Sequence, residues 1–127
     1  MKKLILFLTI LMSNIVMSET IRMVQSDKAF LGNITDKEAA EAFDNPAIEE
    51  KNKVESITLK VGDTIIFSNR DEVKHNVSGW KDKENIFDVK IQEPGLKNDR
   101  SILLSKKGDF IIQCAIHPKM KIKLKVD

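Results

Sequence analysis

Three metal-binding types of side chain follow one another at regular spacing near one end of the chain. Cys114, His117 and Met120 lie within seven residues, and two residues separate each from the next. Their thiolate, imidazole and thioether groups are soft or borderline ligands, which suit transition metals better than hard cations. A second histidine, His75, lies upstream, and the chain has no further histidine or cysteine. We therefore expect these four side chains to bind one transition-metal ion.

This ligand set indicates one metal and one kind of chemistry. Two imidazole nitrogens, one thiolate and a weak axial thioether form the site type that selects copper for electron transfer. Binding deprotonates the thiol, and the histidines bind as neutral imidazoles. Because the set leaves no open position for a substrate, we expect a type 1 blue-copper electron carrier and not an enzyme.

Each of these residues also has an ordinary interpretation when taken alone. A lone histidine is more often a surface residue than a ligand, and a lone cysteine or methionine is more often part of the core. Cys114 and His117 could instead serve a hydrolase, but that requires an oxyanion donor and an orienting acid around a pocket. Their closeness in one tight loop favours a shared metal. Asn76 either bonds across to the Cys114 loop, which would lock the site, or is a turn residue.

The loop that carries three of the four residues lies between two predicted strands. Residues 110–113 precede it, and the strand at 122–126 places lysines outward with Ile122, Leu124 and Val126 inward. His75 follows the apolar run 64–67, so strand pairing must bring it to the loop.

Short strands separated by turn signals continue through most of the remaining chain. We expect strands at 19–25, 55–61, 64–68, 87–91 and 101–104. Ile57, Leu59 and Val61 are predicted to point inward, residues 87–91 alternate again, and Val24 is out of phase with Ile21 and Met23. This spacing is typical of an all-β sandwich or barrel.

Residues 33–53 have a different character. Thr35 and Glu38 fit a capping box, which predicts a helix that continues through Ala39, Ala40, Ala42 and Phe43. Asn45-Pro46 interrupts this pattern, and a second helical turn over 47–50 follows. The segment is either a surface helical insertion that covers one end of a sheet or an element that docks a partner. Its many charges favour the surface insertion.

The first residues have the features of an export signal. A positive start, Met1-Lys2-Lys3, precedes an apolar core from Leu4 to Met12, and small residues precede Glu19. We expect residues 1–18 to be a signal peptide and 19–127 to be the mature domain; an uncleaved anchor is the alternative. Removing residues 1–18 removes Lys2 and Lys3 and no acid, so the net charge falls from +2 to 0. We therefore expect no strongly basic face and no nucleic-acid binding.

The sequence resembles the cupredoxins, and specifically the amicyanin and plastocyanin-like family. The resemblance spans roughly residues 54–127, and its matching segments are 61–67 with Asn69, His75-Asn76-Val77, Gly108-Asp109-Phe110 and 114–120. The two-residue gap between His117 and Met120 is similar to the short amicyanin loop.

The resemblance implies a fold, a cofactor and a role. The implied fold is a cupredoxin-like Greek-key β-sandwich with a short helical insertion. The implied cofactor is one type 1 copper ion with His75, Cys114, His117 and Met120 as its ligands. The implied role is electron transport in the periplasm by a monomer without stable membrane insertion. In this family the exposed edge of the residue corresponding to His117 is the electron port, here ringed by Ile116, Pro118 and Lys119.

The partner and one rival function stay open. An amicyanin-like chain suggests a methylamine dehydrogenase, but the longer segment 33–53 and Lys119 in place of an aromatic depart from the family pattern. A c-type cytochrome, another periplasmic dehydrogenase or another copper protein is equally open. The rival function is a periplasmic copper chaperone or buffer on the same fold.

Overall fold

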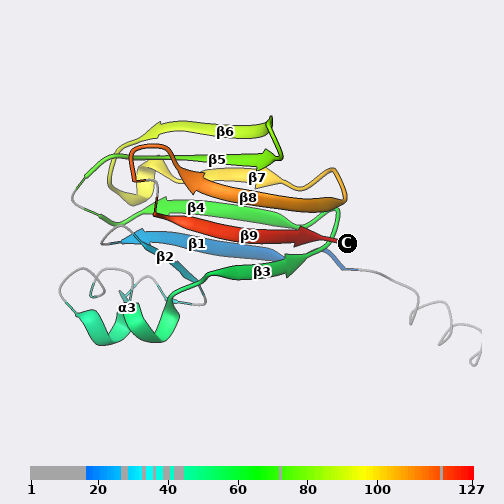
Figure 1. Cartoon of the computed structure of the whole chain (residues 1–127). Coiled ribbons are helices and arrows are strands. Elements are labelled where there is room, and N and C mark those ends of the chain that lie inside the picture. The colour runs from blue at the N-terminus through cyan, green and yellow to red at the C-terminus, as the bar shows by residue number, and fades with distance from the viewer. Residues whose placement is uncertain are drawn as a thin grey trace, which may run out of the picture.

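Two β-sheets form the body of the protein (Figure 1). The computed structural model describes residues 17–26, 29–32, 34–35, 37–38, 41, 45–71, 73–117 and 119–127. The four-stranded sheet has the order β2-β1-β4-β7, with bounds Ala29–Gly32, Thr20–Ser26, Thr64–Asn69 and Arg100–Leu103. The five-stranded sheet has the order β3-β9-β8-β5-β6, with bounds Ser56–Leu59, Lys121–Val126, Gly108–Cys114, His75–Lys81 and Glu84–Gln92. A short 3-10 helix, Leu96–Asn98, precedes β7.

The chain passes repeatedly from one sheet to the other. Strands β3, β4 and β5 alternate between the sheets, and β6, β7 and β8 do so again. As a result β1 pairs with β4 and β3 pairs with β9 in parallel, while the other pairs are antiparallel. This arrangement confirms the predicted all-β Greek-key sandwich with a short helix.

The main core lies between the two sheets and follows the predicted alternation in β9. Ile122, Leu124 and Val126 are buried there, and the lysines between them are exposed. The buried side chains of both sheets form one cluster: Met23, Phe30, Leu59, Ile65, Phe67, Val77, Val89, Leu104, Phe110, Ile112, Cys114, Met120, Ile122, Leu124 and Val126. The loop that carries the predicted ligands is therefore joined to the core at both of its ends, through Cys114 and Met120.

A second, smaller cluster explains why Val24 breaks the alternation of β1. Val24, Ala29, Leu31 and Ile34 are buried together, and Ile48 packs against them. Successive strand residues face opposite sides of a sheet, so Met23 enters the main core while Val24 enters this second cluster. The second half of β1 and all of β2 are thus covered on both faces.

The helical insertion is confirmed where the structure describes it. The Glu38 backbone N–H donates to Thr35 Oγ1 at 3.1 Å, and the Thr35 N–H donates to Glu38 Oε1 at 3.3 Å, as in a capping box. Helix α3, Pro46–Asn52, begins after Asn45, whose Oδ1 accepts the Ala47 N–H at 3.1 Å. It has no buried residue, as a surface element should. The predictions for Ala39, Ala40, Ala42, Phe43 and residues 1–16 lie outside the described residues.

One inward prediction is wrong and one predicted alternation is interrupted, and the backbone shows why in both cases. Val61 is 44% exposed because it belongs to the turn that joins β3 to β4, where Gly62 has a φ of 97°. Ile91 is 64% exposed because Lys90 adopts a φ of 63° and interrupts the pleat of β6. The next residue, Gln92, is turned inward instead.

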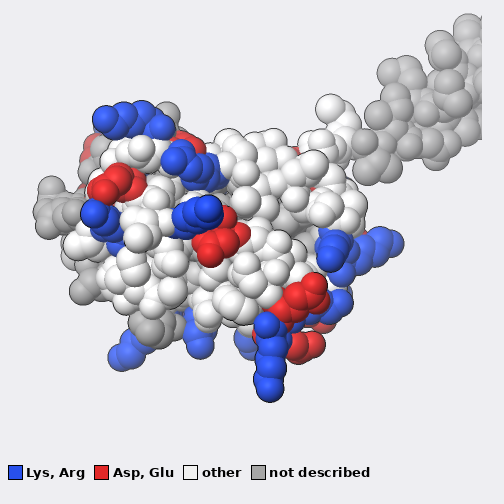
Figure 2. Space-filling view, turned by 90° about the horizontal axis from the view of Figure 1, so that it is seen from above, with Lys and Arg blue, Asp and Glu red and all other residues white. Residues whose placement is uncertain are grey.

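Basic and acidic side chains are interspersed on the face seen from above, with uncharged surface between them (Figure 2). None of the helices in the described part of the chain is long and apolar enough to cross a bilayer.

Asp63 ties three segments together at the turn between β3 and β4. Its Oδ1 accepts the Glu19 N–H and its Oδ2 accepts the Lys60 N–H, each at 2.8 Å. Its backbone carbonyl also accepts the Leu104 N–H at 2.9 Å. The hydrogen bonds from Glu19 and then Lys60 lower the pKa of the Asp63 carboxyl group below its usual value.

We expect Asp63→Asn to lower the melting temperature at neutral pH, because an amide cannot accept both N–H groups. The lowered pKa means that the carboxylate stabilises the fold above about pH 4 and ceases to do so as the pH falls through the folded-state value. The gap in melting temperature between wild type and variant should therefore be constant from about pH 5 to 8 and close below about pH 4. Thermal unfolding across this range is the measurement, with the exposed Asp109→Asn as control. An equal gap at pH 3 would contradict the assignment.

Candidate metal centre

Strand pairing brings His75 to the loop that carries the other predicted ligands. Strands β5 and β8 pair antiparallel with Val77 opposite Cys114. His75, two residues earlier and at the start of β5, therefore lies beside the residues that follow Cys114. The sequence required this pairing but could not establish it.

The loop itself is closed by two backbone hydrogen bonds. The Cys114 N–H donates to the Met120 carbonyl at 3.2 Å, and the Met120 N–H donates to the His117 carbonyl at 2.9 Å. Antiparallel pairing of Gln113 with Lys121 continues this closure into β8 and β9. The loop is thus a tight turn on a hairpin, which limits how far its side chains can move.

Three donor atoms converge on one point. Cys114 Sγ lies 3.5 Å from His75 Nδ1 and 3.6 Å from His117 Nδ1, and the two Nδ1 atoms are 3.2 Å apart. Donor atoms held about 2.0–2.3 Å from one ion lie roughly 3.2–3.8 Å apart in a trigonal or tetrahedral arrangement. The observed separations fit that range without rearrangement. The structure thus has a group of His75, Cys114 and His117 able to bind one metal ion.

The second nitrogen of His75 has a partner that the sequence did not reveal. His75 Nε2 lies 2.8 Å from Asp71 Oδ2, and both residues are buried. A hydrogen on Nε2 that is donated to the carboxylate leaves the Nδ1 lone pair directed at Cys114 and His117. Burial lowers the pKa of His75, although the hydrogen bond and the charge of Asp71 oppose this, so the imidazole is neutral at physiological pH. A neutral imidazole is the form that binds a metal.

Buried amides hold the loop that contains Asp71. Asn69 Nδ2 donates to the carbonyls of Val73 at 2.9 Å and Gln92 at 2.8 Å, and Asn69 Oδ1 accepts the Asp71 N–H at 2.9 Å. Gln92 is itself fixed by Gln25, whose Nε2 donates to Gln92 Oε1 at 2.9 Å. These contacts fix the backbone on either side of Asp71, which in turn orients His75.

Asn76 bonds across to the Cys114 loop, which is one of the two roles that the sequence allowed for it. Its Oδ1 accepts the Ala115 N–H at 3.0 Å and lies 3.8 Å from Cys114 Sγ. Because Asn76 belongs to strand β5, it is not a turn residue. It joins the strand of His75 directly to the loop of Cys114 and His117.

The two ends of the site differ in exposure. His75 and Cys114 are fully buried, while His117 is half-buried beside Ile116, which is 50% exposed. The His75 and His117 rings lie 4.7 Å apart between centroids and are tilted by 50°. Met120 is only 2% exposed and packs in the main core cluster with Cys114.

The architecture and the convergent donors define the class of fold: the chain has the cupredoxin fold. Amicyanin from Paracoccus versutus superposes with a TM-score of 0.58 at 15% identity, over 91% of this chain and 87% of that one. A reduced single-residue variant of amicyanin also gives 0.58, at 16% identity over 91% and 88% of the two chains. The predicted resemblance is therefore confirmed at the level of the fold.

One curated protein is similar in sequence. It is the methylamine utilization protein MauL of Methylophilus methylotrophus, which is 30% identical over 66 residues. The match covers 52% of this chain and only 38% of the length of that protein. No protein-family model matches the chain.

We expect Asn76→Ala to loosen the metal-binding loop without unfolding the sandwich. Loss of the acceptor for the Ala115 N–H should cost about 1 kcal/mol and should speed hydrogen exchange of that amide in the metal-free protein. Exchange measured by NMR tests this, with Asn85→Ala, in the β5–β6 hairpin, as the matched control. Unchanged protection of the Ala115 amide in Asn76→Ala would show that the cross-link does not restrain the loop.

Proposed function

We propose that the protein is a periplasmic type 1 blue-copper protein that shuttles single electrons between redox partners. The observation that supports this most directly is the convergence of two Nδ1 atoms and one thiol at separations of 3.2–3.6 Å. Two imidazoles and one thiolate are the equatorial set that selects copper for electron transfer. Bound copper would supply a one-electron Cu(I)/Cu(II) couple.

Met120 is proposed as the fourth, axial ligand. The loop closure places its backbone against both Cys114 and His117, and its side chain is buried in the same core cluster as Cys114. A thioether is a weak donor that tolerates a long axial bond and tunes the reduction potential. The full proposed ligand set is then His75, Cys114, His117 and Met120.

The surroundings of the donors suit electron transfer because they restrict movement. Asp71 orients His75, Asn76 ties the two sides together, and the hairpin closes the Cys114 loop. Donors that hold their positions in both oxidation states keep the reorganisation cost low. His117 is the proposed electron port, since it is the donor residue that reaches the surface.

A periplasmic copper chaperone or buffer is the second candidate on the same fold. Such a protein has to release its metal, which favours exposed and exchangeable ligands. Here Cys114 and His75 are fully buried, and the second ring nitrogen of His75 is hydrogen-bonded to Asp71, which supports the carrier. The same burial of Cys114 argues against a hydrolase, because a nucleophile must reach its substrate.

Export and partners follow from the same proposal. We propose that residues 1–18 direct the chain to the periplasm and that 19–127 form the mature cupredoxin domain. The name of the similar MauL protein connects it with methylamine utilization. By that likeness a periplasmic dehydrogenase is a candidate electron donor and a c-type cytochrome a candidate acceptor.

Addition of one equivalent of Cu(II) should produce an intense blue band and an EPR spectrum with narrow copper hyperfine splitting. The band arises from charge transfer between the Cys114 thiolate and copper, so Cys114→Ser should lose it while the fold is retained. Visible absorption, EPR and circular dichroism on both proteins test this. A blue Cys114→Ser variant, or a pale wild-type complex, would rule out the proposed centre.

Substitution of Met120 should change the reduction potential in a direction set by the new side chain. Met120→Gln supplies a stronger axial oxygen donor and should lower the potential, whereas Met120→Leu removes the donor and should raise it. Both variants should stay blue, and voltammetry measures the shifts. Identical potentials in all three proteins would mean that Met120 only fills the core.

A further inference from the structure

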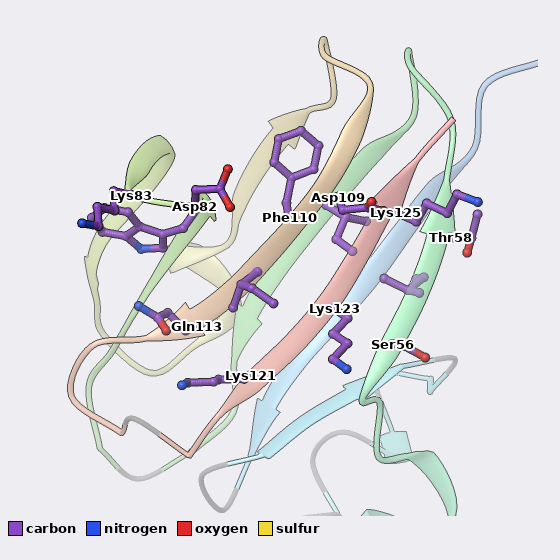
Figure 3. Close-up of a pocket in the computed structure, with 14 residues that line it drawn as sticks. Ser56, Thr58, Asp82, Lys83, Asp109, Phe110, Gln113, Lys121, Lys123 and Lys125 are labelled. Carbon is purple, nitrogen blue, oxygen red and sulfur yellow. The ribbon is translucent and has the colours of Figure 1, made fainter.

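The outer face of the five-stranded sheet is hollowed. Residues of β3, β9, β8 and β5 and of the β5–β6 turn line a hollow of about 820 Å³ on the side of the sheet away from the core. Figure 3 shows Lys121, Lys123 and Lys125 following one another along β9, with Asp82 and Lys83 at the opposite side. We call this surface, defined by Trp80, Lys83, Ile111, Lys121, Lys123 and Lys125, the basic hollow.

The strand register explains how lysines and apolar side chains come to share this surface. Lys123 pairs with Ile111, and Ile111 pairs with Trp80, so these three residues form a row across β9, β8 and β5. Paired residues of neighbouring strands point to the same face of a sheet. Lys121 and Lys125 extend the basic side of the row along β9, because side chains on one face recur every second residue.

The floor of the basic hollow is apolar and held in place. Ile111 is 36% exposed there although it belongs to a central strand. The Trp80 Nε1–H donates to Ser78 Oγ at 2.8 Å, which fixes the indole over the neighbouring strand residues. A fixed aromatic beside an exposed aliphatic side chain is the type of surface on which protein partners bury apolar groups.

The charges at the rim are mostly uncompensated. Lys125 lies 3.8 Å from Asp127 in a loose surface pair, whereas Lys83, Lys121 and Lys123 have no ion pair within the described part of the chain. Asp82 and Asp109 also line the hollow, so its excess of basic groups is moderate. A partner with carboxylates placed around an apolar centre would match this pattern of charges.

We propose that the basic hollow is a docking surface for the acidic face of a protein partner. The hollow favours a protein over an anionic membrane, because a protein surface can follow its shape whereas a bilayer is flat. The hollow also adjoins the proposed centre, since Gln113 and Lys121 line it and directly flank the loop 114–120. Docking here needs neither the metal nor the exposed edge of His117, so it goes beyond the proposed function.

The test is an NMR titration of the ¹⁵N-labelled, metal-free protein with a reduced, acidic c-type cytochrome at low ionic strength. The chain has one tryptophan, so its indole N–H resonance reports on the hollow without ambiguity. We expect that resonance and the amides of Ile111 and Lys123 to shift, and the affinity to fall as salt is added. A basic c-type cytochrome should cause no such shifts.

Matched charge reversals separate a local surface from an effect of overall charge. Lys121→Glu with Lys123→Glu should weaken binding roughly tenfold or more, whereas Lys97→Glu with Lys106→Glu, which changes the net charge equally, should weaken it much less. Equal losses in the two double variants, or shifts elsewhere on the surface, would overturn the proposal. So would binding to phosphatidylglycerol vesicles through these lysines without any response to the acidic cytochrome. Because the protein is metal-free, none of these results depends on the proposed copper site.

Discussion

The antiparallel pairing of β5 with β8 is the contact on which the metal centre depends. It sets Val77 opposite Cys114 and so carries His75 to a histidine that lies 42 residues further along the chain. In an unfolded chain His75 would be far from the other donors, and only Cys114, His117 and Met120 would stay near one another, because few residues separate them. Metal binding is therefore coupled to formation of the five-stranded sheet, and the binding free energy contributes to folding.

Around that pairing, the site is supported by side-chain hydrogen bonds, which lie outside the backbone hydrogen bonding of the two sheets. The side chain of Asn69 bonds to Gln92 and so joins the end of β4 to the end of β6. Asn69 also holds the backbone of Asp71, whose carboxylate orients the imidazole of His75. On the other side, Asn76 holds the backbone of Ala115. Buried polar groups are stabilising when each has a partner, and such networks favour one arrangement over others.

Sequence patterns predicted the fold and the converging donors because both predictions depend on the spacing of residues that are close in the sequence. The alternation in β9 and the interval between Cys114 and His117 are visible in a few adjacent residues. Asp71 was not found, since its role depends on the path of a loop that no periodicity describes. Val61 was misplaced because it lies in a turn, and the predicted alternation of residues 87–91 breaks at Ile91 because Lys90, just before it, has a positive φ.

Strand β9 occupies an inner position of the five-stranded sheet, between β3 and β8, and its pairing with β3 is parallel. Leu59 meets Val126 across that pair, although strands β4 to β8 lie between them in the chain. Contacts of such large sequence separation form late and slowly, because the closure entropy of the intervening chain has to be overcome first. Until β9 inserts, β3 has no neighbour on that side and the loop before β9 is anchored at one end only. The pairing of β9 that completes the five-stranded sheet is thus also the pairing that closes the loop between Cys114 and Met120.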